Sequence, residues 1–142
     1  MKLFSTDFED GGELPEKFTC NGEGAKPSFA WSEIPEGTKS LAISLVDPDA
    51  PGGNFVHWIL VDIPPETLQL SGNELIGREL KNTTGENNYV PPCPPSGKHR
   101  YVFTLYALDI GQIEKEADDN FFSVVKKHTI ELKEITAIYG KL

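Results

Sequence analysis

The stretch LAISLVDPDAPGGNFVHWILVDIPP, residues 41–65, places a turn rich in proline and glycine between two apolar runs. The two runs, residues 41–46 and 56–63, are short and contain many branched and aromatic side chains. They end at Asp-Pro and Pro-Pro, which is typical of buried β-strands. Gly52 and Gly53 allow the chain to turn back between them. We therefore expect two central strands joined by a stiff turn.

Further strands are predicted on both sides of this pair. Residues 101–109 (YVFTLYALD) form a third apolar run, and residues 18–20 (FTC) and 28–31 (SFAW) are candidates for shorter flanking strands. Residues 129–140 (TIELKEITAIYG) alternate apolar and polar side chains, but the phase of the alternation shifts. The shift predicts a bulge or bend near residues 133–134.

One late segment has the periodicity of an amphipathic helix. Its apolar stripe is formed by Ala117, Phe121, Phe122 and Val125. Acidic residues precede this stripe at positions 118–119, and basic residues follow it, as the helix dipole favours. Many strands and one late helix predict a mostly β protein, an antiparallel sandwich with a helix packed on it, rather than a βαβ repeat.

The composition fits one globular domain, which we expect to span residues 1–142. No apolar run approaches the roughly 20 residues of a membrane helix, so we expect no stable membrane insertion. The first 15 residues lack the apolar core of a signal peptide, which favours a cytoplasmic location. The net charge of −9 argues against general nucleic-acid binding, although a small anion site remains compatible with it.

The chain has two cysteines, Cys20 and Cys93, and their spacing matches no metal-binding motif. Reduced thiols are expected in a cytoplasmic protein, and a disulfide between the two remains the alternative.

The first candidate site element is the DPDAPGG turn. Its prolines restrict the backbone, so the carboxylates of Asp47 and Asp49 need little ordering when a ligand binds. The alternative is a surface turn with solvated acids. His57 follows in the next strand, where simple alternation places it with Ile59, Val61 and Ile63 on an apolar face. A core histidine hydrogen-bonded to the backbone is the alternative there.

The second candidate element is PPCPPSGKHRYVF, residues 91–103. Four of its first five residues are prolines, so Cys93 carries the one backbone N–H of residues 91–95, and this N–H is suited to an anion. His99 and Tyr101 are predicted on one face of the following strand, whereas Arg100 lies on the other face, where it could pair with a buried acid. The alternative is a proline-stiffened loop that enters a core strand.

These elements together predict an anion site. If the strands that carry His57 and Tyr101 are neighbours, then Asp47, His99 and the Cys93 amide converge with them. Imidazole, phenol and backbone N–H groups are hydrogen-bond donors, and phosphate is the expected anion.

The motifs DPDAP and P-C-P-P-x-G followed by HRYVF resemble the phosphatidylethanolamine-binding protein family. The resemblance is closest to its bacterial and archaeal Raf-kinase-inhibitor-like (YbhB/YbcL) branch, and it extends over about residues 1–140. It implies an antiparallel Greek-key β-sandwich with a small anion pocket near the surface. On the matching positions it implies ligand contacts from Asp47, His57, His99 and Tyr101. It also implies a pocket wall formed by Cys93, Pro94 and Pro95.

Three kinds of function are compatible with these residues. The leading hypothesis is a non-enzymatic protein, without a cofactor, that binds a phosphate-bearing small molecule or a phosphorylated partner. The second, suggested by the family, is an inhibitor of a kinase or serine protease that acts through the pocket rim. The third is an enzyme with a Cys93–histidine pair, or with a metal held by Asp47, His57 and His99. The sequence leaves open whether the protein is a monomer or a homodimer.

Overall fold

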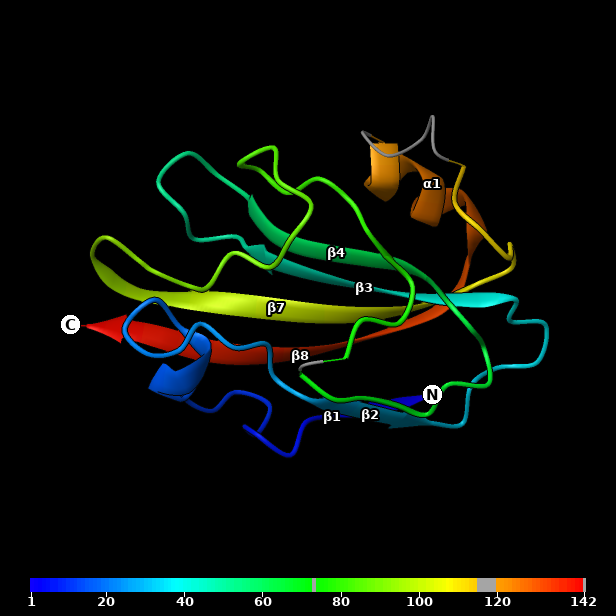
Figure 1. Cartoon of the computed structure of the whole chain (residues 1–142), viewed down its shortest axis with the longest axis horizontal. Coiled ribbons are helices and arrows are strands. Elements are labelled where there is room, and N and C mark those ends of the chain that lie inside the picture. Colours follow the sequence, from blue (N-terminus) through cyan, green and yellow to red (C-terminus); the bar gives the residue numbers. More distant parts are fainter. Residues whose placement is uncertain (73, 115–119, 142) are drawn as a thin grey trace.

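Two antiparallel β-sheets form the framework of the protein (Figure 1). The computed structural model describes residues 1–72, 74–114 and 120–141. In chain order its elements are β1 (Lys2–Phe4), the 3-10 helix η1 (Glu16–Phe18), β2 (Phe29–Ser32), β3 (Ser40–Asp47), β4 (Phe55–Ile63), β5 (Gln69–Leu70), β6 (Arg78–Glu79), β7 (Gly97–Leu108), α1 (Phe121–His128) and β8 (Thr129–Lys141). The small sheet has the order β1-β2-β5, and the large sheet has the order β6-β4-β3-β7-β8.

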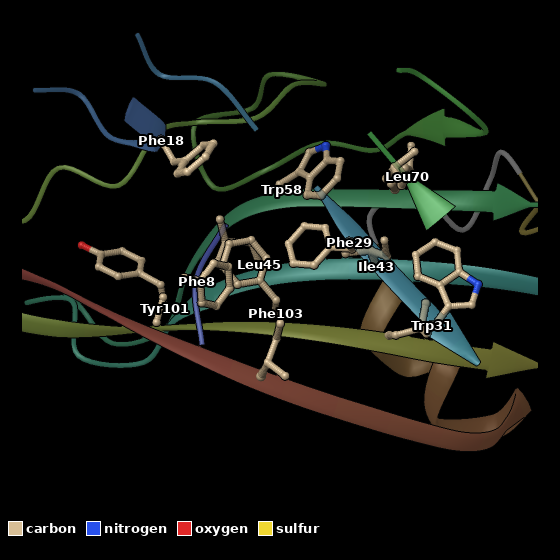
Figure 2. Packing of buried hydrophobic residues seen from close by; sticks show 14 of the residues in the cluster. Phe8, Phe18, Phe29, Trp31, Ile43, Leu45, Trp58, Leu70, Tyr101 and Phe103 are labelled. Carbon is tan, nitrogen blue, oxygen red and sulfur yellow. The ribbon is translucent and has the colours of Figure 1, made fainter. Parts of the chain in front are cut away.

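The main core lies between the two sheets. Phe103 of β7 contacts Phe29 of β2 and Phe8, with ring centroids 4.9 and 5.5 Å apart, and Figure 2 shows these rings in the middle of the cluster. The helix α1 covers the opposite face of the large sheet, where Phe121 packs edge-on against Tyr106. The predicted antiparallel sandwich with a late helix is therefore confirmed.

Two local predictions were wrong, and one falls outside the described residues. Residues 18–20 form no strand, because Pro15 starts a 3-10 turn in which each N–H bonds to the carbonyl three residues earlier. Lys133 and Glu134 pair regularly with β7, and the register shift of β8 lies at Ile130 instead, between the pairs Ala107–Glu131 and Leu108–Thr129. The apolar alternation changes phase because Leu132 is an exposed apolar residue on the other face of the strand from Ile135. The predicted start of the helix, at residues 117–119, is not among the described residues.

The predicted central strands lie inside the large sheet. β3 pairs with β4 on one side and with β7 on the other, so all three strands have a neighbour on each side. The turn that follows β3 and the segment that precedes β7 meet at one end of the sheet, because the two strands are antiparallel. Within the three described ranges, no helix is long and apolar enough to cross a membrane.

Candidate functional site

A β-bulge in β4 determines where His57 points. Leu45 pairs with Trp58 and the next residue, Val46, pairs with Val56, so His57 is an extra residue in the ladder. A bulge reorients the side chain that it contains. As a result, His57 lies beside Tyr101, with ring centroids 5.5 Å apart, on the inner side of the large sheet.

The bulge separates His57 from two of the three residues that alternation placed on its face. Ile59 and Val61 pack on the helix side of the sheet, whereas Ile63 packs in the main core between the sheets. The strands β4 and β7 are not neighbours, because β3 lies between them. The rings of His57 and Tyr101 nevertheless meet across the end of β3.

Asp47, the last residue of β3, is buried and holds His99 in place. Its Oδ2 lies 2.7 Å from His99 Nδ1, and its Oδ1 accepts a hydrogen bond of 2.8 Å from the Asp49 N–H. His99 Nε2 lies 3.1 Å from the Ser96 carbonyl oxygen. A carboxylate oxygen and a carbonyl oxygen therefore face the two ring nitrogens of His99. Both nitrogens are directed at protein groups rather than at the open space of a ligand.

Unlike His99, His57 has only one ring nitrogen that faces a protein hydrogen-bonding group. Its Nδ1 lies 2.7 Å from the Val90 carbonyl oxygen and therefore carries hydrogen. Among the described residues, Nε2 of His57 has no hydrogen-bond partner. Burial lowers the pKa of His57 below its ordinary 6.5, despite the opposing effects of the Val90 carbonyl and the Asp47 carboxylate. In neutral solution Nε2 is therefore an acceptor.

Tyr101 contributes the second open polar group. Its side chain is fully buried, and in the described part of the chain its hydroxyl is the one buried side-chain polar atom without a hydrogen-bond partner. Figure 2 shows Tyr101 at one end of the core, with its hydroxyl directed away from the central rings. Burial, followed by the charge of Asp47, raises the pKa of Tyr101, so the hydroxyl keeps its proton and remains a donor. An unpaired buried hydroxyl is costly, which favours a ligand partner for it.

These groups line a pocket of about 260 Å³. The lining combines the four polar side chains, an apolar rim and the proline segment that precedes β7: Asp47, Ala50, Pro51, Phe55, His57, Val90, Pro91, Cys93, Pro94, Pro95, His99 and Tyr101. Phe55 and the backbone carbonyls of Val90 and Ser96 were not predicted from the sequence. Phe55 lies two residues before His57, and its ring packs 4.7 Å from the imidazole. The two carbonyls carry no side-chain signal.

Asp49 lies outside the pocket lining. Its carboxylate binds the Arg100 guanidinium at 2.8 and 3.0 Å and also accepts a hydrogen bond from the Arg100 backbone N–H. These hydrogen bonds lower the pKa of Asp49 to about 2. The acid that Arg100 pairs with is thus exposed rather than buried, and the pair attaches the turn after β3 to β7.

The two cysteines form a disulfide, contrary to the expectation of reduced thiols. The fold brings their Cα atoms to 5.4 Å although 73 positions separate them in sequence, and this distance is normal for a disulfide. Cys93 remains in the pocket wall beside Pro94, as the resemblance implies. No thiol is present for a Cys93–histidine pair. Asp47 and His99 bind each other, and the described residues contain no metal-binding group of three.

The structure is a β-sandwich with a pocket at the ends of its central strands. Residues 4–140 match the family model "Phosphatidylethanolamine-binding protein". A UPF0098 protein of Chlamydia muridarum is 36% identical, with 98% of each chain covered. The UPF0098 protein YbhB of Escherichia coli is 35% identical, over 99% of this chain and 100% of its own length.

A solved structure gives the same result. The crystal structure of a phosphatidylethanolamine-binding protein homologue from Chlamydia trachomatis superposes with a TM-score of 0.88 at 34% identity, and it covers 99% of this chain and 97% of its own. The chain belongs to the phosphatidylethanolamine-binding protein family.

Proposed function

We propose that this chain is a non-enzymatic binding protein that takes a phosphate-bearing group into the pocket between β3, β4 and β7. The observation that carries the proposal is the buried, unpartnered Tyr101 hydroxyl beside the open Nε2 of His57. A phosphoryl oxygen would accept from the hydroxyl. The Cys93 N–H, the one backbone donor of the proline segment, is the candidate for a second oxygen.

The charges around the pocket favour a protonated phosphoryl group. Asp47 binds His99, and the Arg100 guanidinium is bound to Asp49, so Arg100 is not available to a ligand. A neutral His57 accepts at Nε2 and can receive a hydrogen bond from a P–OH group. If a fully ionised phosphate binds instead, His57 must first take up a proton. In both cases affinity increases as the pH falls.

The apolar rim favours an organic phosphate over the free ion. Ala50, Pro51, Phe55 and Pro94 line the pocket with apolar surface, so an ester with an apolar or aromatic group would bury additional surface. This chemistry is compatible with a small molecule and with a phosphorylated residue of a partner protein.

Inhibition of a kinase or a serine protease is the second candidate. It is favoured by the exposed position of Pro95 and its neighbours at the pocket rim, where a side chain of a target enzyme could insert. An inhibitor that uses the pocket should lose potency in His57→Ala. An inhibitor that acts through another surface should not.

Calorimetric titration with phenyl phosphate between about pH 5.5 and 8 tests the proposed function. We expect binding that strengthens at lower pH and weakens about 10- to 150-fold in Tyr101→Phe, because a hydrogen bond to a charged group is lost. Tyr106→Phe is the matched control, since it removes a hydroxyl from the same strand on the opposite face, where Tyr106 is 3.0 Å from the Ser44 hydroxyl. Folded protein that binds neither phenyl phosphate nor inorganic phosphate at any pH would refute the proposal.

The pH dependence could come from protonation of the phosphoryl group or from protonation of His57. Titration with inorganic sulfate separates these two sources. The charge of sulfate is constant over this pH range, whereas phosphate monoesters titrate within it. Sulfate binding that strengthens at lower pH would therefore report the protonation of His57, and the effect should disappear in His57→Gln.

A further inference from the structure

The disulfide lies on the surface, at the wall of the candidate site. Both Cys20 and Cys93 are exposed, and Cys93 lines the pocket described above. On the other side of the proline segment, Cys93 also lines a hollow of about 460 Å³. The bond is therefore accessible to a thiol in solution. Exposed disulfides are the ones that exchange most readily.

The disulfide joins the proline segment to the loop after η1. The prolines of residues 91–95 have no N–H groups, so this segment cannot be held by a strand ladder. Two hydrogen bonds accompany the covalent bond: the Cys20 N–H to the Pro92 carbonyl at 3.1 Å, and the Tyr89 hydroxyl to the Phe18 carbonyl at 2.9 Å.

The same segment positions both site histidines. The Val90 carbonyl, just before the prolines, binds Nδ1 of His57, and the Ser96 carbonyl, just after them, binds Nε2 of His99. A displacement of the segment would change the orientation of both rings and the width of the pocket. The position of the disulfide, between these two carbonyls along the chain, couples it to the ligand site.

We propose that thiol–disulfide exchange at Cys20–Cys93 regulates ligand affinity, with the oxidised protein as the tight-binding form. This inference rests on the proposed function of the pocket. In the exchange, a thiolate of a dithiol reductant attacks one cysteine sulfur, the S–S bond breaks and a mixed disulfide forms. The other cysteine leaves as a thiolate, and the second thiol of the reductant then attacks the reductant's own sulfur in the mixed disulfide and displaces the first cysteine. Two electrons and two protons pass to the protein, and the reductant leaves as a disulfide.

The test compares phenyl phosphate binding by the oxidised, reduced and reoxidised protein. We expect reduction by a dithiol to weaken binding about 5- to 150-fold, the range of typical coupling between sites, and reoxidation to restore it. The double variant Cys20→Ser/Cys93→Ser should bind as weakly as the reduced protein and should not respond to the reductant. Circular dichroism and thiol titration establish that each sample is folded and in the stated redox form.

A reciprocal measurement checks the size of the coupling independently. If oxidised protein binds more tightly, saturating phenyl phosphate must shift the equilibrium toward the disulfide by the same factor. Equal affinity of the folded oxidised and reduced forms would overturn the redox proposal and leave the proposed function intact. Loss of the whole fold on reduction would also overturn the redox proposal, because the disulfide would then stabilise the entire fold rather than control the pocket. Failure of the oxidised protein to bind would refute the proposed function and, with it, this inference.

Discussion

The burial of His57 in the pocket lowers the stability of the protein at low pH. The folded protein keeps this side chain buried and neutral, with its pKa below 6.5, whereas the unfolded chain binds a proton at the ordinary pKa. The unfolded state therefore holds more protons below about pH 6.5. The stability that depends on a neutral His57 is fully present above the unfolded pKa and is lost as the pH falls toward the folded pKa.

Substitution of His57 by glutamine should remove this pH dependence. The amide can still donate to the Val90 carbonyl but does not titrate. We expect the free energy of unfolding of the wild-type protein to fall relative to His57→Gln between about pH 7.5 and 5.5, as measured by urea denaturation in ligand-free buffer. A constant difference between the two proteins over this range would contradict the assigned direction of the pKa.

At the scale of elements, the sequence predicts the strands that bury both faces but not their irregularities. The apolar runs of β3, β4 and β7 indicate interior strands, because their apolar side chains on both faces of the sheet have to be buried. The bulge at His57 depends on pairing between two strands, which periodicity within one strand cannot reveal. For the same reason, the sequence places His99 and Tyr101 on one face but does not predict that Asp47 and Ser96 occupy both nitrogens of His99.

Gly77 shows how closely β6 packs against the end of β4. Its φ is +101°, and a Cβ atom there would lie 2.3 Å from the Val61 carbonyl oxygen. Gly77→Ala should therefore reduce the free energy of unfolding by more than the roughly 1–2 kcal/mol of a strained backbone. Gly85→Ala is the matched control, because Gly85 has a φ of +87° and open space around the Cβ position. Urea denaturation measures both changes, and equal costs would contradict the predicted clash.

At the scale of the whole molecule, the site is assembled from segments that are distant in sequence. Asp47 and Cys93 lie in recognisable motifs, so the candidate site residues could be predicted from the sequence. The family resemblance indicated that these motifs meet in one pocket. The disulfide could not be predicted, because the separation of Cys20 and Cys93 in sequence gives no information about their distance in space. Asp49 shows the opposite case, since a motif residue is used to attach the turn to Arg100 rather than to line the pocket.

The aromatic contact between the two sheets supports this assembly. Phe103 lies two residues from Tyr101 on the same face of β7 and packs between Phe8 and Phe29, so it connects the large sheet to the small one. Phe103→Ala should reduce the free energy of unfolding by about 3–5 kcal/mol, since it leaves a cavity in a fully buried site. The total free energy of unfolding of a domain of this size is only about 5–15 kcal/mol.

Phe122→Ala is the control for this substitution. Phe122 lies on α1 and is 43% exposed, so its loss should cost roughly 1 kcal/mol or less. Urea denaturation of the two variants measures the difference. If Phe103→Ala is no more destabilising than Phe122→Ala, the two sheets are not held together through the Phe8–Phe29–Phe103 cluster. If it is far more destabilising, as expected, the large sheet depends on the small one for the stability that keeps Tyr101 and His57 in place.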